Sequence, residues 1–262
     1  ELNDLRRRLI SELTAKRGTP PHRRIRQFPP APNQQPAPAQ PNRIFQVLSA
    51  EQLTPELAEL EPDYLYVPLE MLRAVRETGV SEALVGNLGH IFLASKTGFA
   101  VRGDFGLNVF NSYSLDVLSR AGLQSVTASF ELRMAQIRDL KKPLDTEMII
   151  YGRLPAMVSE QCIIKNSAGR CSCQTPGQLA DRMGSVFPVV REFGCRNVIY
   201  NAHKLFLADK RRDYENAGLW GVRMMFTTES ARECVEVAKS YAGLSEYRPN
   251  GLTRGLYYRG VE

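Results

Sequence analysis

The feature that most constrains the fold is a repeated alternation of short apolar runs with amphipathic segments, which begins at Arg43. A strand–helix repeat of this kind predicts a parallel sheet with helices packed outside it. The predicted strands are residues 44–48, 64–67, 83–85, 99–102, 125–128, 148–151, 198–200 and 222–226. Eight strands suit an α/β fold of the TIM-barrel-like (β/α)8 type, reduced or irregular because several of the strands are short.

The helices between these strands are predicted from apolar residues at helical spacing. They are residues 50–60, 69–77, a segment through Ile91 and Leu93, and residues 114–121, 131–140, 205–216 and 230–241. Ser129 is the expected N-cap of the helix at 131–140, because a serine hydroxyl can accept a hydrogen bond from the first turn.

The N-terminal part of the chain has a different character. Residues 1–17 predict a helix with Leu5, Leu9, Ile10 and Leu13 at helical spacing. Residues 18–42 are rich in proline and cannot build a core, so an extended linker is expected. The predicted organisation is therefore a helix at 1–17, a linker at 18–42 and a barrel-like domain at 43–262.

Cysteines are concentrated in one stretch, which we interpret as a Cys-rich insert of residues 152–196 without regular structure. It holds four of the five cysteines, namely Cys162, Cys171, Cys173 and Cys195. Four thiolates can hold a 4Fe-4S cluster or a tetrahedral zinc ion, and the spacing does not distinguish the two metals. Structural thiols or disulfides are the alternative. Cys234, in an amphipathic helix, is expected to be a buried structural thiol.

Polar residues gather where the predicted strands end, which is where barrels of this type carry their sites. The candidate catalytic residues are Asp104, Asn108, Tyr151 and Arg153. Other polar residues at strand ends are Asn87, Asn111, Ser129, Glu131, Asn201, Thr227 and Glu229, and each of them can equally cap a helix or hold a loop.

Composition excludes some classes of protein and permits others. No run of about 18 apolar residues suggests a membrane span, and the first residues lack the apolar core of a signal peptide, so a cytoplasmic location is expected. The formal net charge of +6 and the pI of about 9.1 permit contact with RNA phosphates. A Cys–His hydrolase is a rival possibility, but His22, His90 and His203 are not tied by sequence to a cysteine.

Several separate motifs recur in the order found in one known family. They are VGNLGHIFLA (85–94), GDFGLNVFNS (103–112), YGRLPAM (151–157), LADRMGSVFPV (179–189), CRNVIYN (195–201) and TRGLYYRGVE (253–262). Together they resemble the collagenase-like peptidases of family U32. Over residues 43–262 the chain looks most like the C-terminal module of the long members, so a preceding barrel module of the same or a partner chain is expected. Residues 71–85 form a shorter segment than the family pattern has.

The resemblance carries expectations about function. It implies a barrel-like fold and a 4Fe-4S cluster on Cys162, Cys171, Cys173 and Cys195. Better-understood relatives are oxygen-independent hydroxylases that act on tRNA, rRNA or the ubiquinone ring, and the RNA enzymes use prephenate as the oxygen donor. Arg153 is then a candidate for binding a donor carboxylate.

Three hypotheses remain open from the sequence. The first is an iron–sulfur protein related to RNA hydroxylases, and the second is a peptidase, as the family name says. The third is a non-catalytic barrel that binds RNA or protein and carries a structural metal site.

Overall fold

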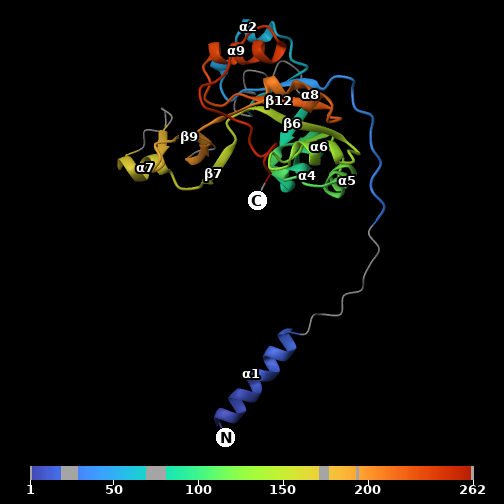
Figure 1. Ribbon diagram of the computed structural model, residues 1–262, viewed down its shortest axis with the longest axis vertical. Helices are drawn as coiled ribbons and strands as arrows, with labels where there is room; N and C mark the ends of the chain where they lie inside the picture. The colour runs from blue at the N-terminus through green and yellow to red at the C-terminus, as the bar shows by residue number, and fades with distance from the viewer. Residues whose placement is uncertain (1, 19–28, 69–80, 171–176, 193–194, 261–262) are drawn as a thin grey trace. The chain divides into compact units, whose positions relative to one another are not determined.

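The computed structural model describes residues 2–18, 29–68, 81–170, 177–192 and 195–260 (Figure 1). The chain divides into two compact units, Glu1–Ala31 and Pro32–Glu262. In the first unit, α1 (Leu2–Gly18) has five large apolar side chains that are all exposed. Every described strand lies in the second unit. No helix in the described part of the chain is long and apolar enough to cross a membrane.

A parallel barrel-like sheet, nearly closed, forms the centre of the second unit. Its strand order is β2-β1-β12-β6-β5-β4-β3. The strands are β1 (Asn42–Gln46), β2 (Tyr64–Tyr66), β3 (Glu82–Val85), β4 (Ala100–Gly103), β5 (Ser125–Thr127), β6 (Asp145–Gly152) and β12 (Gly221–Met225). The predicted α/β barrel, reduced and irregular, is thus confirmed, and these strands match seven of the eight predicted ones.

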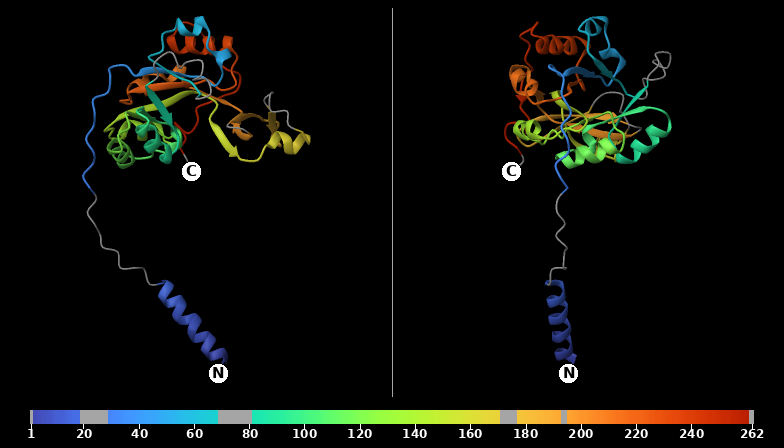
Figure 2. Two further views of the ribbon diagram at one scale, coloured as in Figure 1. Left: turned by 180° about the vertical axis from the view of Figure 1, so that it is seen from behind. Right: turned by 90° about the vertical axis from the view of Figure 1, so that its right-hand side faces the viewer.

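Helices flank this sheet, and polar side chains fix where several of them begin. They are α2 (Pro55–Ala58), α4 (Leu88–Lys96), α5 (Ser112–Arg120), α6 (Met134–Asp139), α8 (Arg211–Glu215) and α9 (Ala231–Ala242). The side chains of Thr54, Asn87, Asn111 and Ser230 accept hydrogen bonds from the first turns of α2, α4, α5 and α9. Figures 1 and 2 show α2 and α9 side by side on one face of the unit.

Some predicted helices differ from the observed elements. Residues 50–60 form a short 3-10 turn at Ala50–Gln52 followed by α2, because Pro55 starts a new first turn there. The predicted N-cap Ser129 is wrong: α6 begins after Arg133, and the Ser129 hydroxyl instead accepts from the Glu131 amide at 3.3 Å. The helix predicted at 69–77 lies outside the described residues.

Strand β6 is the longest strand of the sheet, and its two halves have different neighbours. Residues Asp145, Thr146 and Glu147 pair with β5, whereas Tyr151 and Gly152 pair antiparallel with β11 (Lys204–Phe206). β11 also pairs with β13 (Leu252–Thr253). The helix predicted at 205–216 is therefore wrong in its first part, because backbone pairing with β6 holds Leu205 and Phe206 as a strand. The later part is helical, with a 3-10 turn at Ala208–Lys210 followed by α8.

The Cys-rich insert has regular structure, contrary to the expectation of an irregular loop. A separate antiparallel sheet has the order β7-β10-β9-β8, with α7 (Ile163–Ala168) between β7 and β8. The strands are β7 (Pro155–Ser159), β8 (Gly177–Ala180), β9 (Val186–Glu192) and β10 (Arg196–Tyr200). Figure 1 shows this sheet and α7 projecting from one side of the barrel. The strand predicted at 198–200 thus belongs to the insert sheet and not to the barrel.

The apolar core lies between the barrel sheet and its helices. Side chains that alternate along the strands face the helices, among them Phe45, Val126, Met148, Val222 and Met224, all no more than 3% exposed. From α9, Cys234, Val235, Val237, Ala238 and Tyr241 are buried at helical spacing. The opposite face of the strands points into the barrel, where the side chains are largely polar.

Candidate functional site

A network of charged and polar side chains fills the barrel interior, and Arg223 on β12 is its centre. The Arg223 side chain is fully buried. Its Nη1 donates to Asp104 Oδ1 at 2.7 Å and to Gln46 Oε1 at 3.1 Å. Its Nη2 donates to Glu147 Oε2 at 2.7 Å and to the Thr127 hydroxyl. Two carboxylates therefore balance this guanidinium inside the barrel.

Glu147 on β6 is the second centre of the network. Its Oε1 accepts from the Tyr66 hydroxyl at 2.8 Å and from the Ser125 hydroxyl at 2.6 Å. Ser125 in turn accepts from Arg102 Nη1 at 3.0 Å, and Arg102 forms a two-pronged ion pair with Glu82 at 2.7 and 3.0 Å. Each of the seven barrel strands thus contributes at least one side chain to the network.

Burial and nearby charge oppose each other in setting the pKa of Arg223 and act in the same direction on the pKa of Tyr66. Burial acts to lower the pKa of Arg223, but the carboxylates of Asp104 and Glu147 outweigh it and hold the pKa above its usual value. Burial, followed by the Glu147 charge, raises the pKa of Tyr66. Arg223 therefore stays charged and Tyr66 stays neutral, and most of the network is closed to solvent. Asp104, with 17% of its side chain exposed, connects it to the C-terminal ends of the strands.

Sequence reasoning did not single out Arg223, Glu147 or Arg102. A signal was present: each is a charged residue in or directly beside an apolar strand run, at a position whose alternation points away from the helices. In a barrel strand, such a charge faces the interior and requires a partner there.

A second polar cluster lies at the C-terminal ends of β6 and β12. The Tyr151 hydroxyl donates to Glu229 Oε1 at 3.1 Å, and Lys204 Nζ lies 3.3 Å from the same oxygen. Lys204 also pairs with Glu233 Oε1 at 2.5 Å, as does the Tyr247 hydroxyl. Burial, followed by the Glu229 charge, raises the pKa of Tyr151. Tyr151 is therefore a neutral hydrogen-bond donor at this edge.

The candidate Arg153 follows β6 directly and joins two loops at this end of the barrel. Its Nη1 donates to the Asn201 carbonyl at 2.9 Å and to the Ala202 carbonyl, and its Nε donates to the Thr228 hydroxyl at 3.3 Å. The loop after β10 is thereby held against the loop after β12. Among the described residues no hydrogen bond engages Arg153 Nη2, so one side of this guanidinium can still receive a carboxylate.

The remaining strand-end residues serve mainly to hold the backbone. Asn87 and Asn111 cap α4 and α5, and the Asn108 backbone takes a left-handed conformation with φ of 53°. Asp104 Oδ1 accepts from the Phe105 amide at 2.8 Å in addition to its pair with Arg223. The Thr227 amide donates to Glu229 Oε2 at 2.5 Å. The structure therefore brings Tyr151 to Glu229 and Asp104 to Arg223, and places Asn108 apart from both clusters of hydrogen bonds.

Two of the four candidate ligand cysteines lie in the described part of the insert. Cys162 precedes α7 and is 9% exposed, and its Sγ accepts a hydrogen bond from the Lys165 amide at 3.3 Å. Cys195 precedes β10 and is exposed. Cys171 and Cys173 lie outside the described residues. Within the described part of the chain, no three His, Cys, Asp or Glu side chains converge on a metal position.

Asn197 connects the two cysteine segments. Its Oδ1 accepts from the amide of Ile163, the residue after Cys162, at 2.7 Å, and Asn197 itself lies two residues after Cys195. The Asn197 side chain is buried, and its Nδ2 has no hydrogen-bond partner among the described residues. The Asn197 side chain thus joins the segment that follows Cys162 to the strand that follows Cys195, and cysteine thiols are the ligands that an iron–sulfur group requires.

The other thiol and the histidines do not form a catalytic pair in the described residues. Cys234 is fully buried, and burial with the nearby Glu229 and Glu233 charges raises its pKa to about 12, so it is an inert structural thiol as expected. His203 Nδ1 interacts with the Gly251 carbonyl at 3.0 Å. No hydrogen bond among the described residues joins a histidine to a cysteine.

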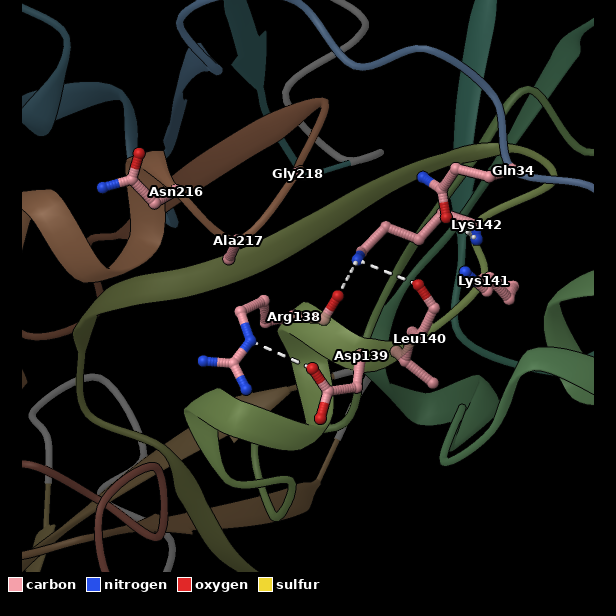
Figure 3. A pocket seen from close by; sticks show the side chains of 9 residues that line it. All are labelled: Gln34, Arg138, Asp139, Leu140, Lys141, Lys142, Asn216, Ala217 and Gly218. Atoms are coloured by element: carbon pink, nitrogen blue, oxygen red, sulfur yellow. Dashed lines mark hydrogen bonds and ion pairs between the residues drawn. The ribbon is translucent and has the colours of Figure 1, made fainter.

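A cavity of about 450 Å³ lies at the opposite end of the barrel, before β6 and β12 (Figure 3). Its central side chain is Lys142, which is 3% exposed and donates from Nζ to the Arg138 and Leu140 carbonyls at 3.3 and 3.2 Å. Burial lowers the pKa of Lys142 to about 8. These bonds satisfy carbonyls at the C-terminal end of α6, so Lys142 acts here as a helix cap. Barrels of this type carry their sites at the other end.

Comparison with known proteins agrees with the motifs. Residues 63–181 match the model of Peptidase family U32. A search of curated proteins finds no match. Among solved structures, the chain is similar to the Bacillus megaterium QM B1551 spore cortex-lytic enzyme SleL, with 13% identity and a TM-score of 0.29 over 86% of this chain and 77% of that one. A likeness at this level supports no inference about function.

The matched residues run from just before β2 to just after β8. They include Asp104, Tyr151, Arg153 and Cys162. Over residues 63–181 this chain is therefore shown to match Peptidase family U32, the family that its sequence motifs resemble.

Proposed function

We propose that this protein is an iron–sulfur protein that resembles the oxygen-independent hydroxylases of tRNA or rRNA. The observation that carries the proposal is the insert, in which Asn197 ties the segment of Cys162 to the segment of Cys195. The RNA substrate and the oxygen donor, prephenate, rest on the resemblance of the motifs, and the net charge of +6 is compatible with an RNA partner.

The ligands of the proposed 4Fe-4S cluster are Cys162, Cys171, Cys173 and Cys195. When bound, such a cluster would supply electron transfer or polarise an oxygen-rich donor. The Lys165 amide donates a hydrogen bond to Cys162 Sγ at 3.3 Å, which orients this proposed ligand at the start of α7.

The neighbouring barrel end offers groups for a carboxylate-bearing donor such as prephenate. Arg153 keeps Nη2 available while Nη1 and Nε hold the loops, so it can bind a carboxylate without releasing them. Tyr151 stays neutral at the same edge, and its hydroxyl proton orients Glu229 there. Asp104 and Asn108 complete the proposed catalytic set on the loop that follows β4.

Metal analysis tests the cluster directly. Anaerobically purified wild-type protein is expected to contain about four iron and four sulfide per chain. Cys162→Ala and Cys195→Ala should each lose most of the iron, because each removes a proposed ligand. Cys234→Ala is the matched control, since Cys234 is a buried residue of α9 outside the insert, and it should keep the full iron content. Zinc without iron in the wild type would sink the proposal and favour a structural zinc site.

A peptidase is the second candidate, favoured by the match to Peptidase family U32. Hydrolysis of gelatin or casein by metal-depleted protein would support it, because a peptidase built on this barrel has no need of the cluster. If iron-loaded and metal-depleted preparations both leave these substrates intact, the peptidase candidate fails.

A further inference from the structure

The cavity of about 450 Å³ before β6 and β12 contains a buried cation, the side chain of Lys142 (Figure 3). Lys142 is 3% exposed, and its Nζ lies between two walls of the cavity. One wall is the end of α6 with the residues that follow it. The other is the loop after α8, where a Cβ built on Gly218 would lie 3.9 Å from Lys142 Nζ. The ammonium group therefore lies beside a space large enough for a small molecule.

The backbone of Lys142 is held by the segment that leads into β1. The Lys142 amide donates to Gln34 Oε1 at 2.9 Å, and the Lys142 carbonyl accepts from the Gln35 amide at 2.8 Å. Gln34 also lines the cavity. These residues belong to the same compact unit as the barrel, so the cavity and its lysine are formed within one unit.

The charge of Lys142 is incompletely matched. An ammonium group has three N–H donors, and two of them reach the Arg138 and Leu140 carbonyls, which leaves the third without an acceptor among the described residues. The two carbonyls provide only the partial negative charge of a helix end. Asp139, a carboxylate of the cavity wall, pairs with Arg138 Nε at 2.9 Å, and no described carboxylate forms an ion pair with Lys142. A buried cation normally has such a partner.

The other charged groups around the cavity indicate the class of partner. Arg138 and Lys141 are exposed and line the cavity with Lys142, and Asp139 is the acidic residue among the described lining residues. The loop after α8 and the segment of Gln34 add no charged side chain to this lining. Burial lowers the pKa of Lys142 to about 8, so an anion beside Nζ would stabilise the cationic form. Phosphate and carboxylate are the groups that a lysine ammonium commonly binds.

We propose that this cavity binds a small anionic molecule, whose phosphate or carboxylate group accepts a hydrogen bond from Lys142 Nζ. Arg138 and Lys141 add positive charge around the same space. The site is separate from the carboxylate site proposed at Arg153, because Lys142 precedes β6 and Arg153 follows it. It requires neither the cluster nor the RNA partner.

Isothermal titration calorimetry of the complete chain with inorganic phosphate, and separately with succinate, tests the site. The wild type should bind at least one of these probes, and the tighter one identifies the anionic group. Lys142→Met should weaken this binding by roughly tenfold or more, the size of one lost charge-assisted hydrogen bond. Lys96→Met is the matched control, because Lys96 is an exposed residue of α4 outside the cavity, and it should change the affinity by less than about twofold.

The pH dependence of binding to the wild type covers the case in which Lys142→Met does not fold. Above a pH of about 8, Lys142 loses its proton, and binding of the anion must then take up a proton. At constant ionic strength the affinity should therefore fall by up to roughly tenfold per pH unit between about pH 8 and 10. No binding of either probe, equal losses in Lys142→Met and Lys96→Met, or an affinity that stays constant over this range would overturn the proposal. The iron content of the protein tests the proposed function separately.

Discussion

At the scale of single residues, the barrel interior depends on the partners of Arg223. A buried ion pair contributes little net stability relative to apolar residues, but removing one partner leaves the other charge buried and uncompensated. Glu147 is the partner that also binds Tyr66 and Ser125, so it links the guanidinium to the far side of the barrel.

We therefore expect Glu147→Gln to lower the free energy of unfolding by about 3 kcal/mol, because Arg223 loses one of its two carboxylates. Urea denaturation at neutral pH measures this loss. Glu131→Gln is the control, since Glu131 is exposed and should change the free energy of unfolding by less than about 0.5 kcal/mol. Equal effects of the two substitutions would show that the interior charge of Glu147 is not required.

Lys142 gives a pH-dependent prediction. Its pKa is lowered to about 8 in the folded protein, below the value of about 10.4 for an unfolded lysine. The unfolded chain therefore binds more protons in this window, and the stability should rise as the pH increases from about 8 to about 10.4. Lys142→Met should remove this part of the slope, whereas Lys141→Met, at an exposed position, should keep it. Denaturant unfolding between these pH values measures the slope, and parallel profiles for the two variants would contradict the prediction.

At the scale of elements, β6 is the strand that connects the parts of the domain. Its first half pairs with β5, its last two residues pair with β11, and β12 lies along its other edge. Gly152 ends β6 with φ of +130°, and a Cβ there would lie 2.2 Å from the Met225 carbonyl oxygen. The exit of the chain from barrel to insert thus requires glycine at this place.

Gly152→Ala is expected to lower the free energy of unfolding by more than about 2 kcal/mol, because it adds both backbone strain and a clash with β12. Gly184→Ala, in the turn between β8 and β9, is the matched control: φ is +83° and the added Cβ meets nothing within 4 Å. It carries only the conformational cost of about 1 kcal/mol. Thermal unfolding of the two variants measures these losses of stability. A smaller loss of unfolding free energy for Gly152→Ala than for Gly184→Ala would refute this account.

The same elements show how far the sequence could predict the fold. Barrel strands such as β1 and β12 are apolar on the helix-facing side, and their short apolar runs between helical segments made them recognisable. β10 has an equally apolar run, but nothing in a run of this length tells which sheet it joins. β11 was missed because its strand conformation comes from pairing with β6, a contact between segments about 50 residues apart.

The residues of the candidate site also differ in how far the sequence could predict them. Thiols and strand-end residues are visible in the sequence because their residue types carry the chemistry. Arg223 and Glu147 form a pair across 76 residues, and Asn197 binds the Ile163 amide across 34. Such pairs depend on the register of strands that are distant in sequence, so only the three-dimensional structure reveals them.

At the scale of the whole molecule, charge is unevenly distributed. Residues 152–196 carry six arginine or lysine and three aspartate or glutamate residues, so a segment of less than a fifth of the chain holds half of the net charge of +6. This segment is the insert that begins at the C-terminal end of β6, next to Tyr151 and Arg153. If the partner is RNA, its phosphates should lie along the insert.

The last prediction concerns this partner. Arg182 and Arg191 are exposed residues of the insert, on the β8–β9 turn and on β9. Replacing both with alanine should weaken binding to tRNA or rRNA fragments and reduce the slope of log affinity against log salt concentration by about 0.7–0.9 for each lost phosphate contact. Lys141→Ala combined with Arg212→Ala is the control, because these exposed residues precede β6 and β12 at the other end of the barrel. Filter binding at several salt concentrations measures both quantities. Affinity that does not change with salt, or equal losses in the two double variants, would exclude the insert as the RNA-binding face, because phosphate contacts are local and each one contributes its own share of the slope.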